Sequence, residues 1–316
     1  MAVNGEPPIV EFARDYNQYV TLGPAVRGEG AAMYKANYLS VPEDQSVEEI
    51  IVGIKVFDPY GVKDIYSLTK EFYMAKQLSR AENIVGVHCS FLHKNLLYLV
   101  MPFVHGVSLK SLVSSSFPRG LPESEVAFVL KETLMALSYI HARRFVHENV
   151  CSDCVFIDGE SSSLKLGFRF LTLDKPDSST VSSDGLIVAP ELLMDRTKAR
   201  DQKADIWSIG LLALELHYGR VPASNHGDLK SVVTAIGDRR SLDFVRKIVG
   251  SCFTASEAVH SKKMSSSLGD VIALCLSPFP SRRPTATELL DHKFFRECKP
   301  VKHKLFTKLQ QGKNSF

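Results

Sequence analysis

Residues 49–57 read EIIVGIKVF, a run rich in β-branched residues between an acidic segment and a proline-containing segment. Such a run is typical of a β-strand, and Lys55 lies near its end. A helix is predicted next over residues 64–80, because apolar side chains recur there at spacings of three and four. A second strand is predicted at residues 96–101, ended by Pro102. Strand, helix and strand in this order set the first part of the fold.

Two longer helices are predicted in the second part of the chain. Residues 123–144 carry a regular apolar pattern with basic residues in the last turn, and another apolar helix is expected from Asp205 to Tyr218, closed by Gly219. Strands dominate before Met101 and helices after it, which predicts an α+β fold of two unlike lobes. Serine-rich runs are expected to be loops, at residues 114–116, 178–183 and 265–267.

The composition is that of a globular chain with enough apolar residues for a large core. It has 316 residues, of which 45% are hydrophobic and 23% are charged. The net charge of +3 comes without a basic stripe, so nucleic acid is not an expected partner. No apolar run reaches the roughly 18 residues that a membrane helix needs, and no leader pattern opens the chain. With six scattered cysteines, the chain is expected to be cytoplasmic.

The chain resembles the eukaryotic protein kinases over residues 16–298, because motifs of that family occur in the family's order and spacing. The matching stretches are Val52-Gly53-Ile54-Lys55, Ala189-Pro190-Glu191 and Asp205-Ile206-Trp207-Ser208-Ile209-Gly210. Arg283 adds the arginine that this family pairs with the glutamate of A-P-E, which is Glu191 here. A single short motif can arise by chance, but several in register indicate the fold.

The resemblance implies a bilobal kinase fold, with a small β-rich N-lobe that holds one main helix and a larger helical C-lobe. The expected parts are an N-terminal extension (1–15), the N-lobe (16–102), the C-lobe (103–298) and a basic tail (299–316). The resemblance also implies structural roles for His147, Glu191, Asp205 and Arg283.

Three further segments resemble the Ste20 group of this family, and in particular its plant Ste20-like, SPAK/OSR-like and STRAD-like members. These segments are residues 100–103, 114–123 and 290–295. STRAD-type pseudokinases bind a kinase and a scaffold protein in place of phosphorylating a substrate. The resemblance therefore implies an active protein kinase, a scaffold protein or both as partners.

Residues 147–154, HENVCSDC, have the spacing of the kinase catalytic loop, H-R-D-x-K-x-x-N. The resemblance assigns the positions of the family's catalytic aspartate, lysine and asparagine to Asn149, Cys151 and Cys154. An amide can orient a hydroxyl group but cannot act as a carboxylate base, and losing such a base commonly slows the reaction by about a hundredfold to ten-thousandfold. This replacement alone is expected to cripple turnover without abolishing it.

The metal-binding motif D-F-G follows a short strand in the family, where this chain reads LKLGFRF at residues 164–170. The triplet is Phe168-Arg169-Phe170 or, with a one-residue gap, Gly167-Phe168-Arg169, and neither contains a carboxylate. Mg²⁺ requires oxygen ligands in near-octahedral geometry, so the thiol of Cys154 is no replacement. No metal site is predicted, and rescue is not expected from the nearest acids, Asp153, Asp158 and Asp174.

The loop that covers the phosphates is also degraded. The positions of the family's three glycines are taken by Val26, Gly28 and Ala31. Gly30 restores some pliability, but Glu29 puts a negative charge near any triphosphate. Lys55 and Glu71 have the spacing of the ion pair that positions phosphates in active kinases, or they only hold the helix in place. Binding of ATP without metal stays open, at the residual positions Gly28, Gly30, Lys55, Glu71, Met101 and Phe103.

Two other patterns suggest chemistry outside this scheme. Cys151 and Cys154 have the C-x-x-C spacing of redox motifs and of half a zinc site, but no second pair completes a zinc set. Coincidental replacement is favoured over a thiol-dependent regulator, which would show an oxidant-dependent mass change. Residues 178–183 lie where kinases carry activating phosphosites, but the arginine that would bind the phosphate is Glu148 here. Phosphorylation is therefore not expected to order this segment by the usual route.

The basic tail carries apolar residues at helical spacing, Val301, Leu305 and Leu309. A terminal helix packed on the large lobe is favoured over a helix for a partner or a membrane surface.

The sequence thus predicts a pseudokinase of the Ste20-like family, a catalytically inactive allosteric or scaffolding partner of an active kinase in signalling. The cofactor left open is ATP without Mg²⁺. The alternative is an atypical Ser/Thr protein kinase with weak ATP-dependent phosphotransfer.

Overall fold

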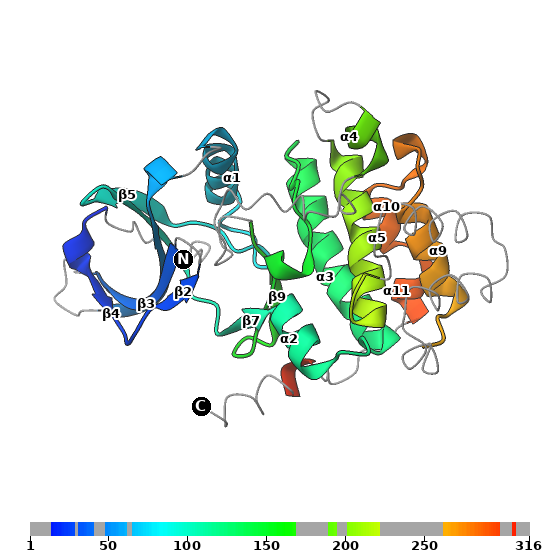
Figure 1. Cartoon of the computed structure of the whole chain (residues 1–316), viewed down its shortest axis with the longest axis horizontal. Coiled ribbons are helices and arrows are strands. Elements are labelled where there is room, and N and C mark those ends of the chain that lie inside the picture. Colours follow the sequence, from blue (N-terminus) through cyan, green and yellow to red (C-terminus); the bar gives the residue numbers. More distant parts are fainter. Residues whose placement is uncertain are drawn as a thin grey trace, which may run out of the picture. The chain divides into compact units, whose positions relative to one another are not determined.

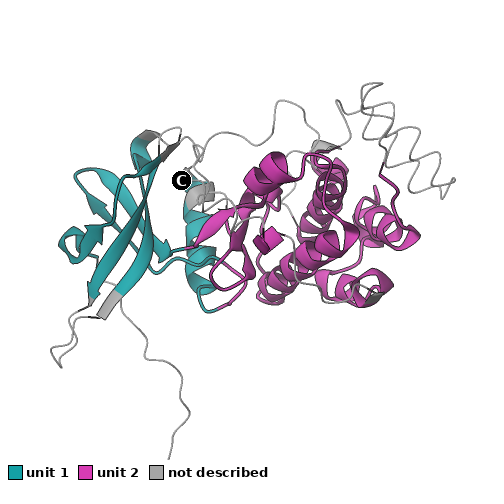
Figure 2. Ribbon diagram, turned by 90° about the horizontal axis from the view of Figure 1, so that it is seen from below, with its two compact units in different colours: residues 1–80, 85–103, 173–177 teal, residues 81–84, 104–172, 178–316 magenta. Residues whose placement is uncertain are grey.

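The computed structural model describes residues 14–28, 31–40, 48–61, 65–168, 189–194, 201–221, 262–297 and 305–307. The chain divides into two compact units, coloured separately in Figure 2. Unit 1 consists of residues 1–80, 85–103 and 173–177, and unit 2 of residues 81–84, 104–172 and 178–316.

Unit 1 is built on an antiparallel sheet with the strand order β1-β3-β4-β6-β5, and β2 also pairs with β3 (Figure 1). Its strands are β1 (Tyr19–Thr21), β2 (Val26–Gly28), β3 (Ala31–Ser40), β4 (Glu48–Phe57), β5 (Cys89–His93) and β6 (Leu96–Pro102). Its helices are η1 (Tyr16–Gln18), η2 (Pro59–Gly61) and α1 (Ile65–Gln77). The strand expected at residues 49–57 and the helix expected at 64–80 are confirmed as β4 and α1. Pro102 is the last residue of β6 and pairs with Val52, so that strand runs one residue further than expected.

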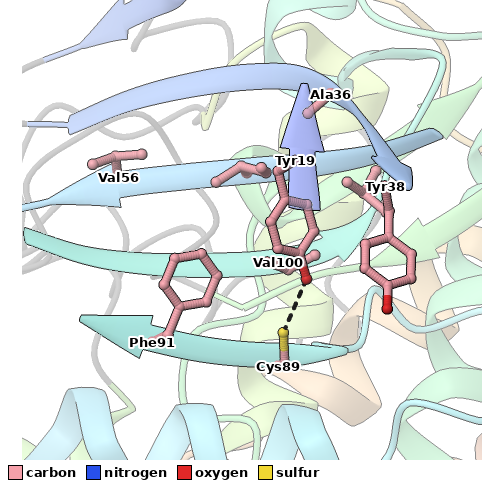
Figure 3. Packing of buried hydrophobic residues seen from close by; sticks show 9 residues of the cluster. Tyr19, Ala36, Tyr38, Val56, Cys89, Phe91 and Val100 are labelled. Atoms are coloured by element: carbon pink, nitrogen blue, oxygen red, sulfur yellow. Dashed lines mark hydrogen bonds between the residues drawn. The ribbon is translucent and has the colours of Figure 1, made fainter. Parts of the chain in front are cut away.

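In the core of this sheet, side chains from its two edge strands, β1 and β5, are in contact. The ring of Tyr19 on β1 stacks on that of Phe91 on β5 with the centroids 5.7 Å apart, and the Tyr19 hydroxyl lies 3.5 Å from Cys89 Sγ (Figure 3). Because β1 and β5 stand at opposite ends of the strand order, the sheet must curl for these side chains to meet. Burial raises the pKa of the Tyr19 hydroxyl. Aromatic pairs of this kind add about 0.5–1.5 kcal/mol beyond the burial of apolar area.

Unit 2 is mainly helical and also holds a small antiparallel sheet in the order β7-β8-β9. Its strands are β7 (Gly106–Ser108), β8 (Val155–Asp158) and β9 (Ser163–Leu166). Its helices are α2 (Leu109–Ser116), α3 (Glu123–Ala142), η3 (Ser152–Cys154), α4 (Pro190–Met194), α5 (Gln202–Tyr218), α9 (Ser266–Cys275), η5 (Pro280–Arg282), α10 (Ala286–Leu290) and α11 (Lys293–Glu297). The small sheet lies in the part of the chain where the sequence pattern suggested helices.

Helix α5 is the central helix of unit 2 and packs against both α3 and α9 (Figure 1). A Cβ at Gly210 would lie 2.6 Å from Cγ of Leu276, so this glycine permits the close approach of α5 to the end of α9. Gly219 ends α5 with φ 83°, in the left-handed region that favours glycine, as the sequence predicts. None of the described helices is long and apolar enough to cross a membrane.

Several helix ends differ from the predictions. Helix α3 ends at Ala142 rather than in residues 143–144, and Arg143 is its cap. Helix α5 begins at Gln202 because the Asp201 side chain accepts hydrogen bonds from the N–H groups of Lys203 and Ala204. The sequence pattern missed this cap because the apolar residues begin one turn later.

Two of the serine-rich runs are not loops. Residues 114–116 form the end of α2, and Ser265 caps α9, since its Oγ accepts a hydrogen bond from the N–H of Leu268 at 3.2 Å. Serine is a strong cap and a tolerable helix residue, so its local clustering does not separate loops from helix ends. The third run, residues 178–183, lies outside the described residues.

His217 on α5 is fully buried, and neither ring nitrogen has a hydrogen-bond partner among the described residues. Burial and the nearby Lys262 ammonium lower the pKa of His217 to about 4. The neutral form is therefore favoured in the folded state. We expect this contribution to stability to be complete above about pH 6.5 and to be lost progressively as the pH falls from 6.5 to about 4, by about 3 kcal/mol in total.

The measurement is the urea midpoint of unfolding between pH 7 and pH 4 for the wild type and for His217→Phe, which cannot take up a proton. The variant should show a shallower fall in stability over this range. His88 has its pKa lowered by burial in the same way, so some slope should remain. Identical slopes in the two proteins would contradict the assignment to His217.

Candidate functional site

Asp205 holds the start of the segment that corresponds to the catalytic loop. Its side chain is buried, and its two oxygens accept hydrogen bonds from the backbone N–H groups of His147 and Glu148, each at 2.8 Å. Nε2 of His141 lies 2.8 Å from the same carboxylate. Glu148 has φ 68°, a strained conformation for a non-glycine residue. One buried carboxylate therefore fixes the entry into residues 147–154.

His147 lies in the core beneath this segment and is 1% exposed. Its ring stacks on Phe168 with the centroids 5.1 Å apart. Nε2 lies 3.0 Å from the carbonyl oxygen of Gly167, and Nδ1 accepts a hydrogen bond from the N–H of Asn149 at 3.3 Å. Since Nδ1 accepts, Nε2 carries the proton and donates to the carbonyl. Burial lowers the pKa of His147, which keeps the ring in this neutral form.

Gly167 lies directly beside Cys154. Strands β8 and β9 pair Val155 with Leu166, and the N–H of Gly167 continues the pairing by donating to the carbonyl oxygen of Cys154 at 2.7 Å. Phe168 instead turns to His147. Of the two alignments left open by the sequence, this geometry favours the one with a gap, in which Gly167 rather than Phe168 takes the position of the metal-binding aspartate. Residues 169 and 170 lie outside the described residues.

Asn149, Cys151 and Cys154 form one polar cluster. The amide nitrogen of Asn149 donates to Cys154 Sγ at 3.3 Å, and Cys154 is fully buried. A hydrogen bond from the Cys154 thiol lowers the pKa of the half-buried Cys151 thiol. The structure thus brings together the residues at the family's catalytic positions, and the cluster offers an amide and two thiols but no carboxylate.

The nearby acids have other partners. Asp153 forms an ion pair with Lys110 on α2 at 2.8 Å. Asp158, at the other end of β8, accepts hydrogen bonds from the N–H groups of Glu160 and Ser161 in the β8–β9 turn. Although its burial acts in the opposite direction, these hydrogen bonds lower the pKa of Asp158. Asp174 lies outside the described residues.

This set of side chains does not fit Mg²⁺. The position beside Cys154 is a glycine, Cys154 supplies sulfur, and Asn149 points its amide nitrogen toward that sulfur. Within the described part of the chain, no three His, Cys, Asp or Glu side chains are arranged to hold a metal ion.

The positions of the phosphate-covering loop lie in unit 1, on the β2–β3 hairpin. Gly28 is directly opposite Ala31, and Val26 is opposite Met33. Val26 is 59% exposed, so a bulky side chain stands where the family has its first glycine. Residues 29 and 30, which include the predicted Gly30, lie outside the described residues.

The other residual nucleotide-binding positions also lie in unit 1. Lys55 on β4 is fully buried, and its ammonium lies 5.9 Å from the centroid of the Phe57 ring. Glu71 on α1 is half-buried, and its ion pair with Lys55 stays a prediction. Met101 on β6 is 4% exposed. The Lys35 ammonium lies 5.0 Å from the centroid of the Phe103 ring.

Glu191 and Arg283 form a bidentate ion pair in unit 2, with both N–O distances 2.7 Å. The Arg283 side chain is 0% exposed and that of Glu191 is 10% exposed. Arg283 also donates to the carbonyl oxygens of Ser277 and Lys203, each at 2.9 Å. Each guanidinium nitrogen of Arg283 therefore donates at least one hydrogen bond, and these bonds connect the A-P-E segment to α5 and to the end of η5.

One contact had no signal in the sequence, whereas another was expected. The Ser152 hydroxyl lies 2.6 Å from Oε1 of Glu215 on α5, and burial raises the pKa of that carboxyl. In the tail, Leu305 is fully buried and the ring of Phe306 meets Phe128 of α3 edge-on at 5.9 Å. These described tail residues therefore pack on unit 2, which agrees with the favoured expectation for Leu305.

The profile of the family described as Protein kinase domain matches residues 43–295. The chain is 29% identical over 297 residues to the serine/threonine-protein kinase fray1 of Dictyostelium discoideum, covering 92% of this chain and 48% of that protein. It is 28% identical over 222 residues to the serine/threonine-protein kinase PAK 1 of Mus musculus, covering 69% and 37%. It is 28% identical over 276 residues to sporulation-specific protein 1 of Saccharomyces cerevisiae, covering 85% of this chain and 51% of that protein.

These matches confirm the bilobal kinase fold expected from the sequence, together with the antiparallel sheet of unit 1 and the helices of unit 2. The fray and PAK relatives support the Ste20 group. The chain spans about half of the length of these curated relatives or less.

Proposed function

Because the chain belongs to the protein kinase domain family, we propose that it is a cytoplasmic pseudokinase of the Ste20 group. In this role it binds an active protein kinase or a scaffold protein and acts allosterically instead of transferring phosphate. The observation that carries the proposal is the cluster of Asn149, Cys154 and Gly167, in which both Asn149 and Gly167 donate a hydrogen bond to Cys154 and none of the three is a carboxylate.

Phosphate transfer loses two contributions to catalysis. An amide at Asn149 in place of a carboxylate base lowers the rate of phosphate transfer by about a hundredfold to ten-thousandfold. The metal loss is more severe, because Mg²⁺ neutralises the charge of the transferred phosphoryl group in this family. Cys154 and Gly167 supply no oxygen from their side chains, and the carboxylate of Asp153 is held by Lys110. The loss of the base and the loss of Mg²⁺ both slow the transfer of the phosphoryl group.

Nucleotide binding without metal is the second part of the proposal. Lys55 and Glu71 are retained in sequence and lie in the same unit as the β2–β3 hairpin. A lysine at this position can attract the phosphates of ATP without a metal ion. With Val26 and Ala31 in place of glycines, the backbone cradle is weaker, so we expect modest affinity.

The test is thermal unfolding of the protein with saturating ATP, once with Mg²⁺ and once with EDTA. At a ligand concentration of a hundred times Kd, binding adds about 2.7 kcal/mol to stability. We expect equal upward shifts of the midpoint in the two conditions, and no shift for Lys55→Met. A shift that occurs only with Mg²⁺ would overturn the metal-independent proposal.

A matched pair of variants tests the assignment of Gly167. The triple variant Asn149→Asp, Cys154→Asn and Gly167→Asp restores the family's carboxylates and amide, and should gain an extra shift that depends on Mg²⁺. Gly167 is not among the described residues with positive φ, so its backbone conformation does not require glycine. With Phe168→Asp in place of Gly167→Asp, no such gain is expected, because the side chain of residue 168 lies against His147, and this change also buries a carboxylate where Phe168 is 1% exposed.

A second candidate, a weakly active Ser/Thr protein kinase, is favoured by the names of the fray1 and PAK 1 relatives, which are serine/threonine-protein kinases. It predicts phosphate transfer from ATP to a generic protein substrate that is abolished by Lys55→Met. Transfer equal in the wild type and Lys55→Met would rule this candidate out.

A further inference from the structure

Cys151 and Cys154 stand at the two ends of one tight turn in unit 2. Cys151 is the residue before η3 and Cys154 is its last residue, and the N–H of Cys154 donates to the carbonyl oxygen of Cys151 at 3.0 Å. The Cys151 side chain lies within hydrogen-bond reach of the Cys154 thiol, so the turn brings the two thiols together. A turn of this kind keeps its end Cα atoms within about 7 Å, in the range that a disulfide spans.

The two residues inside the turn hold it in place. The Ser152 hydroxyl lies 2.6 Å from Oε1 of Glu215 on α5, and Asp153 is paired with Lys110 on α2 at 2.8 Å. These contacts fix the turn from two different helices. The thiols are therefore held together before any reaction, and a bond between them requires little movement of the backbone.

The two thiols differ in accessibility. Cys151 is half-buried, whereas Cys154 is fully buried beneath it. The hydrogen bond from Cys154 lowers the pKa of the Cys151 thiol, which favours the reactive thiolate at the more exposed position. The other described cysteines, Cys89 and Cys275, are buried, and burial raises the pKa of both thiols. They serve as internal references in the same protein.

We propose that Cys151 and Cys154 form a redox modification site, at which a hydroperoxide oxidises Cys151 and Cys154 closes a disulfide across the turn. The Cys151 thiolate attacks the peroxide oxygen, so that the O–O bond breaks and Cys151 becomes a sulfenic acid as the peroxide leaves as an alcohol or water. The Cys154 thiolate then attacks the sulfenic sulfur and releases water. The net reaction consumes two thiols and one hydroperoxide and yields one disulfide.

This site lies at the positions that the family uses for its catalytic lysine and asparagine, but it does not depend on the proposed function. The disulfide removes the thiol toward which the Asn149 amide points. It also locks the turn between α2 and α5. The modification would therefore change the segment at residues 147–154 in response to peroxide.

The experiment treats the reduced full-length chain with increasing hydrogen peroxide, blocks free thiols with an alkylating reagent, and maps peptides by mass without reductant. We expect a peptide that has lost two hydrogens across residues 151–154. It should form on the order of tenfold faster than any oxidation of Cys89 or Cys275. Oxidation of either reference cysteine without this linkage, or no linkage at any peroxide concentration, would overturn the proposal.

Two variants separate the roles of the thiols. In Cys154→Ser, Cys151 should accumulate as a sulfenic acid that a dione reagent traps, and in Cys151→Ser, Cys154 should stay unoxidised. Oxidation of Cys154 in Cys151→Ser at the wild-type rate would contradict the order of reaction. Thermal unfolding checks that both variants fold, and Cys154→Ala replaces Cys154→Ser if the buried hydroxyl proves destabilising.

Discussion

Replacing Glu191 with alanine is expected to lower the free energy of unfolding by about 3–5 kcal/mol, because it leaves the guanidinium of Arg283 buried without its counter-charge. The Arg283 side chain is 0% exposed, so bulk solvent does not screen its charge once the carboxylate is removed. The loss of two short hydrogen bonds, both at 2.7 Å, adds to the electrostatic cost. The change should appear in urea unfolding as a lower midpoint with an unchanged slope.

The chain contains a matched control for this prediction. Lys293 and Asp270 form an ion pair at 3.0 Å in which both side chains are 50% exposed. Asp270→Asn should cost no more than about 1 kcal/mol, because solvent screens the pair. If Glu191→Ala costs no more than Asp270→Asn, the buried pair does not stabilise unit 2. A double variant, Glu191→Leu with Arg283→Met, should cost less than the sum of its single changes, since it removes both charges together.

Replacing Asp205 with alanine is expected to cost a similar amount, about 3–5 kcal/mol, since it leaves several buried donors unsatisfied at once. The N–H groups of His147 and Glu148 would lose their acceptor, and so would Nε2 of His141 if it donates to the carboxylate. Glu148 has φ 68°, a costly conformation for a non-glycine residue, and the substitution removes a hydrogen bond that helps to offset this cost. Hydrogen exchange at the two amides measures the effect directly, and it should rise together with a lower thermal midpoint.

Asp201→Ala is the control for Asp205→Ala, because both carboxylates lie at the start of α5. Asp201 only caps the helix, by accepting from the N–H groups of Lys203 and Ala204. Its loss should cost about 0.5–2 kcal/mol and leave the exchange of the His147 and Glu148 amides unchanged. Equal effects of the two substitutions would mean that Asp205 acts as a helix residue and not as an anchor of residues 147–154.

Much of the fold follows from local pattern. The run of β-branched residues predicts β4, and apolar spacing predicts α1, α3 and α5 within a few residues, because the burial of one face of a helix requires that spacing. The residues at which helices begin and end were less predictable. Asp201, Ser265 and Arg143 act as caps through hydrogen bonds to particular backbone groups, and composition alone does not reveal these. In the small sheet of unit 2, the resemblance implied the strand β9, but β7 and β8 were missed because they are only three and four residues long.

The sequence by itself determined that the family's catalytic aspartate and asparagine are replaced by Asn149 and Cys154, since residue identity at a motif position needs no coordinates. It left two alignments for the metal-binding position, because a one-residue shift preserves the local pattern. Only the tertiary structure favoured one, by pairing Gly167 with Cys154 and stacking Phe168 on His147. Likewise, C-x-x-C spacing is common by chance, whereas a turn fixed by α2 and α5 holds the two thiols together. The physical reason is that such contacts join residues far apart in the chain, and their geometry is set by packing rather than by neighbouring sequence.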